Sequence, residues 1–236
     1  MIAPIVITGV GKRIGYALAK HLLSTGHSVI GTYRTEYESI KELRQLGAEL
    51  YYCDFYDDVQ VARFIETVKT NHAQLRAIIH NASDWLPDSN ASSPAETLKR
   101  MMQVHVSTPY QINLALVDSL RACKEEFSDI IHFTDYVADK GSKKHIAYAA
   151  SKAALANMTL SFSALLAPKI KVNAIAPAMI MFNPDDNAEY REKTLQKSLM
   201  KIEPGTQEII DTVHYLLHSR YVTGRTLHVD GGRHLR

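Results

Sequence analysis

Residues 5–15 read IVITGVGKRIG, and this stretch decides the fold. The run Ile5–Thr8 predicts a buried strand, and the amphipathic segment Ile14–Leu23 predicts a helix directly after it. Glycines at such a turn let the backbone approach a pyrophosphate, and the free N–H groups of the helix start favour its charge. The strict G-x-G-x-x-G spacing is not met, because the third glycine stands at position 15. Taken alone, the turn also fits a strand–helix junction without a ligand.

Short apolar runs and helix-period segments alternate along the rest of the chain. Further buried strands are expected at Ser28–Tyr33, Glu49–Asp54, Ala77–Asn81, Ile130–Thr134 and Val172–Ile175, and a last one within residues 223–232. Helices are expected at Tyr37–Leu46, Val59–Lys69 and Gln207–Leu217. Right-handed crossovers between such elements predict a single-domain, doubly wound α/β fold with a parallel sheet and helices on both faces. The polar segment 182–205 predicts a helical insertion or substrate lid within this one domain, residues 1–236.

The composition of the chain argues against several kinds of binding partner. The chain has 236 residues, 46% hydrophobic and 22% charged, which is typical of a soluble globular protein. A formal charge of +2 argues against nucleic acid or a membrane surface as a partner. Two cysteines and a strand pattern that starts near Pro4, with no room for a signal peptide, predict a cytoplasmic protein. The histidines form no metal-ligand motif, so no metal is expected.

The end of the second strand indicates which dinucleotide would bind. A site selective for NAD usually places an acidic residue ~20 residues past the glycines to hold the ribose 2′-hydroxyl. Here the chain has Arg34 at the strand end, and the first acid, Glu36, comes later. Arg34 together with Lys12 or Arg13 would clamp a 2′-phosphate by charge-assisted hydrogen bonds, which favours NADP(H). The alternative is that Arg34 is only a solvent-exposed charge at the strand end, with no ligand.

A candidate acid–base pair stands at the start of an alanine-rich helix. Tyr148 and Lys152 are four residues apart, which places them on one helical face. A tyrosine with a pKa near ~10 is a poor proton donor and acceptor at neutral pH, and an adjacent ammonium stabilises its phenolate. The alternative is an exposed helix face, but the preceding strand Ile130–Thr134 would end beside the glycine turn.

These motifs together resemble the short-chain dehydrogenase/reductase family over essentially the whole chain. The resemblance rests on the turn Thr8–Gly15, the triplet Asn81-Ala82-Ser83, the Tyr148/Lys152 pair, and the ending Val222-Thr-Gly-Arg…Val229-Asp-Gly-Gly232. It implies a Rossmann fold with a seven-stranded sheet, the tyrosine as acid/base, and the lysine on the nicotinamide ribose. The cofactor-binding residues that it implies are Gly9, Lys12, Arg13, Ile14, Gly15, Tyr33, Arg34, Asp54, Phe55, Asn81, Ala82, Ser83, Tyr148, Lys152 and Pro177.

Two positions depart from the family pattern. Asp135, thirteen residues before Tyr148, stands where most members carry a catalytic serine, and His105 stands where most carry an asparagine. A serine hydroxyl donates to a carbonyl that is becoming an oxyanion, whereas an ionised aspartate only accepts. Asp135 therefore disfavours a simple ketone and favours a ring that is rich in N–H groups. His105 fits equally a catalytic relay and a histidine packed against a neighbouring helix.

The combination of Lys-Arg in the glycine turn with an aspartate before the tyrosine resembles the pteridine reductases. The implied reaction is NADPH-dependent reduction of a 7,8-dihydropterin to the tetrahydro form, with dihydrofolate as a poorer substrate. Hydride would pass to C6, and Tyr148, Asp135 or water would protonate N5. Substrate-binding residues would be Arg13, Ser83, Trp85, Asp135 and Tyr148. Trp85 would stack on the pterin ring, the alternative being a tryptophan that anchors its loop.

Other assignments stay open at this stage. Another reductase of the family would act on an acyl-carrier ketone or a quinonoid pterin, and a catalytically idle protein would only sense NADPH. The helix face of Ala149, Ala153 and Ala156 is narrow enough for close packing. In the family such a helix builds subunit contacts, which implies a homodimer or homotetramer.

Overall fold

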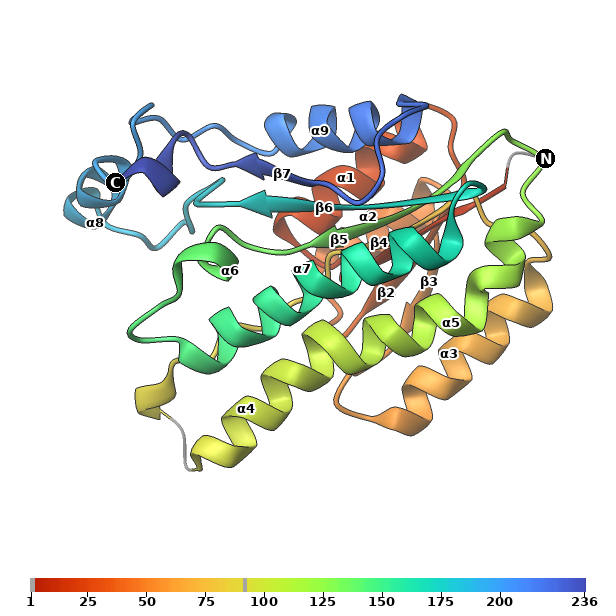
Figure 1. Ribbon diagram of the computed structural model, residues 1–236, viewed down its shortest axis with the longest axis horizontal. Coiled ribbons are helices and arrows are strands. Elements are labelled where there is room, and N and C mark those ends of the chain that lie inside the picture. Colours follow the sequence, from red (N-terminus) through yellow and green to blue (C-terminus); the bar gives the residue numbers. More distant parts are fainter. Residues whose placement is uncertain (1–2, 91–92) are drawn as a thin grey trace.

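The computed structural model describes residues 3–90 and 93–236. Seven strands form one sheet in the order β3-β2-β1-β4-β5-β6-β7, and every neighbouring pair is parallel (Figure 1). The strands are β1 Ile5–Thr8, β2 Val29–Tyr33, β3 Glu49–Tyr52, β4 Ala77–His80, β5 Ser128–Phe133, β6 Ile170–Pro177 and β7 Thr226–Val229. The predicted doubly wound, seven-stranded fold is confirmed.

Helices cover both faces of this sheet (Figure 1). They are α1 Arg13–Ser24, α2 Glu38–Gln45, α3 Asp58–Asn71, α4 Pro94–Met102, α5 Thr108–Arg121, α6 Val137–Lys140, α7 Ile146–Leu166, α8 Ala188–Leu195 and α9 Gln207–His218. Strand side chains alternate between the two faces, so Ile78 packs with α3, α5 and α7 while Ile79 packs with α1, α2 and α9. Both faces are therefore buried in the five central strands, which explains their apolar runs, whereas the edge strands β3 and β7 are partly exposed, so the prediction of a buried strand at Glu49–Asp54 is wrong in that respect.

The strand order reverses between β1 and β4, and ligands of doubly wound sheets bind at the carboxyl ends of the strands at such a point. Three predicted strands extend too far in this region, the third being Ile130–Thr134, since β5 ends at Phe133. β3 ends at Tyr52 because the Asp54 carboxylate accepts the Tyr56 N–H and turns the chain. β4 ends at His80, which leaves Asn81 in the loop above the sheet.

The segment 182–205 contains α8 between irregular stretches. Its end is fixed by the N–H groups of Leu199 and Met200, which both donate to the Gly231 carbonyl. Across the two described ranges, no helix combines the length and the apolar character that a membrane span requires.

Candidate active site

A cavity of about 530 Å³ opens at the carboxyl edge of the sheet. The glycine turn and the residues that follow β2, β4, β5 and β6 line it. All of the predicted site residues line this cavity except Asp54, whose carboxylate instead holds the turn after β3. The fold also brings together side chains that lie far apart in sequence, since Arg13 contacts Asn183, 170 residues later.

The glycine turn is shaped by close packing against the loop after β4. Gly9 has a φ of +75°, and a Cβ there would lie 2.8 Å from the Ala82 Cα. Asn81 Nδ2 donates to the carbonyl oxygens of Thr8 and Gly9, at 3.1 and 2.9 Å. Within the described chain no side chain caps the start of α1, so its first N–H groups can bind an anion.

Two cations of the predicted phosphate clamp already have partners in the structure. Arg34, with its side chain 47% exposed, lies with Nη1 3.3 Å from Asp84 Oδ2, and Tyr56 donates to the same oxygen at 2.9 Å. Arg13 donates to Asn183 Oδ1 at 2.6 Å and to the Met181 carbonyl at 2.9 Å, which connects the glycine turn to the segment 182–205. Lys12 Nζ lies 5.6 Å from the centre of the Tyr37 ring.

Asp84 was missed by sequence reasoning. It stands fifty residues from Arg34, and no pattern in the sequence pairs the two positions. Its carboxylate also accepts the Trp85 N–H at 3.0 Å. A cofactor phosphate at Arg34 would therefore have to compete with a carboxylate that the protein itself supplies.

The acid–base group is a phenol hydrogen-bonded to a carboxylate. The Tyr148 hydroxyl donates to Asp135 Oδ2 at 2.9 Å. Burial raises the pKa of Tyr148 well above its usual value, and the nearby Asp135 charge raises this pKa further. Burial also raises the pKa of the Asp135 carboxyl. The proton between them therefore resides on Tyr148, which can release it when a more basic nitrogen approaches.

Lys152 lies close to this pair. Its Nζ donates to the Phe133 carbonyl at 2.7 Å and lies 5.6 Å from the centre of the Tyr148 ring. Burial lowers the pKa of Lys152 to about 8. Burial and Asp135 both favour the neutral phenol, and the stabilisation of the phenolate by this ammonium stays a prediction.

His105 lies behind the site and does not line the cavity. It is buried in a π-helical turn, Gln103–Ser107, that joins α4 to α5. Its Nδ1 is 2.8 Å from Ser151 Oγ, and its Nε2 is 2.8 Å from Ser83 Oγ. Because the Ser151 hydroxyl donates to the Tyr148 carbonyl, Nδ1 must carry the proton and Nε2 accepts from Ser83. Burial lowers the pKa of His105 well below its usual value, so a neutral imidazole connects Ser83 to the helix of Tyr148.

Trp85 combines features of both predicted roles. One face of its indole stacks on His145, with ring centres 3.8 Å apart and planes at 24°. The side chain also lines the cavity and is 62% exposed. The tryptophan is thus anchored on one side and available to a flat ligand on the other.

The site offers no metal centre in residues 3–90 and 93–236, since no three potential ligands cluster there. Its features are those of a dinucleotide cleft with a proton-carrying pair at one end.

Comparison with known proteins places the chain in a family. A family model described as enoyl-(acyl carrier protein) reductase matches residues 9–234. Dihydromonapterin reductase of Enterobacter sp. (strain 638) is 59% identical over 232 residues, covering 98% of this chain and 97% of that protein. The corresponding protein of Citrobacter koseri is 55% identical over 233 residues, covering 99% and 97%.

Among solved structures, FolM alternative dihydrofolate reductase 1 of Brucella canis, complexed with NADP, is 26% identical, with a TM-score of 0.85. The match covers 99% of this chain and 94% of that one. Since the family model and these relatives extend over nearly the entire length, the chain belongs to the short-chain dehydrogenase/reductase family of oxidoreductases.

Proposed function

We propose that the protein reduces a 7,8-dihydropterin with NADPH, that 7,8-dihydromonapterin is its preferred substrate, and that it reduces dihydrofolate more weakly. The observation that carries this proposal is the Asp135–Tyr148 hydrogen bond, which sets an acceptor carboxylate where a ketone reductase needs a donor hydroxyl. The dihydromonapterin reductases at 54–59% identity support the substrate class.

The chain's residues fit NADP(H). Position 9 requires glycine, because a Cβ there would collide with Ala82. A pyrophosphate needs such a bare backbone turn and free N–H groups, which the uncapped start of α1 supplies. Arg34, directly after β2, and Lys12, in the glycine turn after β1, supply positive charge to the cavity. The NADP in the related FolM structure of Brucella canis supports the same assignment. When bound, the reduced cofactor supplies the hydride.

Residues of the chain would bind and orient the two ligands and supply the proton. Lys152 would hold the nicotinamide ribose, and Trp85 would cover the pterin ring from the opposite side. Asp135 would accept hydrogen bonds from pterin N–H groups, which orients the ring. Tyr148 would pass its proton to N5 while C6 receives the hydride. The phenolate so formed regains a proton from solvent before the next turnover.

Steady-state kinetics on the pure protein test this proposal. We expect kcat/KM with NADPH to fall in the order dihydromonapterin, dihydrobiopterin, dihydrofolate, and to be lower with NADH throughout. Turnover of a simple ketone without any dihydropterin reduction would replace the assignment with a generic carbonyl reductase. Measurable turnover of any dihydropterin would exclude a protein that only senses NADPH. A cytoplasmic location stays a prediction.

A further inference from the structure

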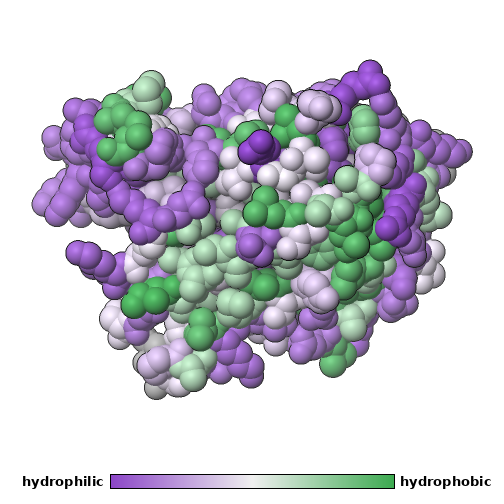
Figure 2. All heavy atoms as spheres, viewed as in Figure 1, coloured by the Kyte–Doolittle hydropathy of each residue, from purple (hydrophilic) through white to green (hydrophobic). Residues whose placement is uncertain are grey.

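A second cavity, of about 520 Å³, lies at the end of the molecule that carries α6, α8 and the last residues. Of the described residues that line it, none has a carboxylate side chain, and five are cationic: Lys140, Lys143, Lys197, Arg233 and Arg236. Figure 2 shows a notch in the molecular outline at this end, bordered by hydrophilic side chains. A hollow lined mainly by positively charged side chains attracts anions.

Three of these cations have no carboxylate partner among the described residues. Lys140 already donates to a main-chain oxygen of Arg236, whose guanidinium donates to the Gln196 carbonyl at 2.9 Å. Lys143, Lys197 and Arg233, by contrast, form no ion pair with any carboxylate of the described chain.

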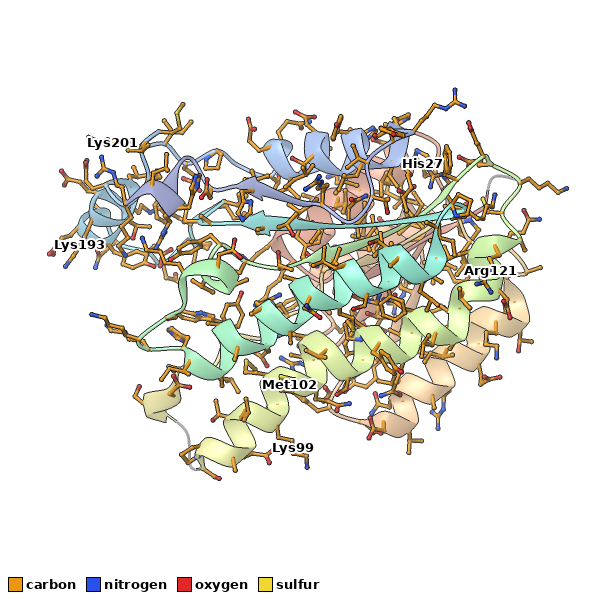
Figure 3. All side chains as sticks on the ribbon, in the orientation of Figure 1. His27, Lys99, Met102, Arg121, Lys193 and Lys201 are labelled. Carbon is orange, nitrogen blue, oxygen red and sulfur yellow. The ribbon has the colours of Figure 1, made fainter. Side chains whose placement is uncertain are left out.

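The positive charges in this cavity also repel one another. Burial lowers the pKa of Lys197, and the charges of Arg233, Lys193 and Lys144 lower it further. Figure 3 places Lys193 at the same end of the molecule. An anion bound among these groups would relieve the repulsion.

The basic cavity adjoins the proposed pterin site. Tyr136 lines it, and the preceding residue, Asp135, lines the active-site cleft. Arg233 lies over the Tyr136 ring, with its guanidinium carbon 4.3 Å from the ring centre. The Arg233 charge also reaches Asp135, because it lowers the pKa of that carboxyl against the larger effect of burial. Consecutive Cα atoms are about 3.8 Å apart, so the two linings come close here, and a substituent on a ring held at Asp135 would have to pass Tyr136 to reach the basic cavity.

Building on the proposed function, we propose that this cavity binds an anionic group carried by the side chain of the dihydropterin substrate. The group is either a phosphate on the side-chain hydroxyls or the carboxylates of a glutamyl tail, since both present oxygen anions to Lys143, Lys197 and Arg233. The protein would then prefer an anionic dihydropterin to its neutral counterpart.

The test compares four substrates with NADPH: neutral dihydromonapterin, its phosphate ester, and dihydrofolate with one or several glutamates. The variants are Lys143→Ala, Lys197→Ala and the double substitution, with Lys201→Ala, an exposed lysine outside the cavity, as the matched control. Arg233 is left intact because its charge acts on Asp135. We expect kcat/KM for an anionic substrate to fall about two- to fivefold for each lysine removed and about tenfold for both. Neutral dihydromonapterin should be unaffected, and added salt should reduce only the anionic preference.

The outcomes separate this inference from the assignment of the reaction. A loss confined to the phosphate ester identifies phosphate as the ligand, and a loss that grows with glutamate number identifies the tail. Equal kcat/KM values for neutral and anionic substrates in wild type and variants would overturn the inference while leaving dihydropterin reduction intact. If no dihydropterin is reduced, the proposed function fails. Quenching of Trp85 fluorescence by the same ligands then measures binding without turnover, since the chain has one tryptophan. Affinity for the anionic ligands that does not respond to the double substitution would also refute the basic cavity as their site.

Discussion

At the scale of single residues, the chemistry depends on which atom of the Tyr148–Asp135 pair holds the proton. Both groups have a raised pKa, and the hydroxyl is the donor in their 2.9 Å hydrogen bond. A phenol with a raised pKa keeps its proton at neutral pH and gives it only to a site whose basicity increases during reaction. A pterin nitrogen next to a carbon that receives hydride is such a site.

Asp135→Ser tests this pair directly. We expect kcat/KM for dihydropterin to fall by ~10²–10⁴, the usual contribution of a general acid–base group, because the acceptor for pterin N–H groups is lost. The same change supplies a hydroxyl donor, so weak reduction of an activated ketone should appear. Asp135→Asn, which keeps the size and removes the charge, is the matched control, and NADPH binding reports folding. Undiminished dihydropterin reduction in Asp135→Ser would leave the pterin assignment without its physical basis.

Cofactor choice depends on Arg34. Replacing it with alanine should raise KM for NADPH roughly 10-fold, since a hydrogen bond to a charged group contributes about 1.5–3 kcal/mol and Asp84 offsets part of it. KM for NADH should hardly change. Arg121→Ala, an exposed arginine at the end of α5, is the control for general loss of positive charge. Equal losses with both cofactors would mean that Arg34 only supports the loop through Asp84.

At the scale of helices and strands, the spacing of apolar residues predicted the elements whose positions depend on burial. Apolar runs located six strands, and the glycine-rich ending located β7, because burial on both faces requires these residues. The departures occur at local features that the spacing of apolar residues does not show. β3 stops early because of the Asp54 turn, and His105 occupies a π-helical turn that periodicity does not reveal.

In the site, residues at strand ends were predicted, whereas residues placed by folded loops were not. Every predicted cavity residue except Asp54 lines the cleft, because the strand ends carry them there. The partner of Arg34 and the cations near Tyr136 were not predicted, since Asp84 and Arg233 reach their places only through the folded loops.

One buried ion network connects several elements and predicts a local effect on stability. Asp129 at the start of β5 contacts Arg76 next to β4, and its Oδ1 is 3.0 Å from Lys171 Nζ in β6. Both cations also donate to carbonyls at the end of α9, Arg76 to Leu217 at 2.6 Å and Lys171 to Leu216 at 2.7 Å. The Asp129 carboxylate therefore connects three strands and one helix, with Glu125 as a second partner of Arg76.

Asp129→Ala should lower the free energy of unfolding by about 3–5 kcal/mol, because the buried Lys171 loses its anion and the buried Arg76 keeps only the half-exposed Glu125. Chemical denaturation monitored by circular dichroism would measure the loss. Asp118→Ala, which removes an exposed partner of Arg121 on α5, should change stability little. A small effect at Asp129 would show that water or the α9 carbonyls alone satisfy the two cations.

At the scale of the whole molecule, an apolar surface over α5 and α7 predicts self-association (Figure 2). Tyr110 and Leu114 of α5 and Ile146, Leu160 and Leu165 of α7 are all exposed. Light scattering coupled to size-exclusion chromatography should show a homodimer or homotetramer. Leu160→Asp should dissociate it, and Leu98→Asp on α4 is the control. A monomeric wild type at micromolar concentration would contradict the prediction.

The whole fold should lose stability in mild acid because of its buried histidines. Burial lowers the pKa of His80 to about 4, from an unfolded value near 6.5, while its Nε2 is hydrogen-bonded to Asn113 Oδ1 at 2.7 Å. Burial also lowers the pKa of His132 well below its usual value. A histidine with a lowered pKa binds a proton more readily in the unfolded chain, so stability is full above pH 6.5 and declines as pH falls toward 4.

The size of this effect follows from the shift at His80, which corresponds to about 3 kcal/mol once pH falls below both values. The raised pKa values of Asp129 and Asp135 act in the opposite direction, since a protonated carboxyl favours the folded state. We therefore compare wild type with His80→Gln, which keeps a donor for Asn113, by urea denaturation at pH 7.5 and pH 5. The variant should lose less stability between the two pH values than wild type does. His228→Gln, at an exposed position, should behave like wild type. An identical decline in all three proteins would assign the acid sensitivity to other groups, with His132 as the next to replace.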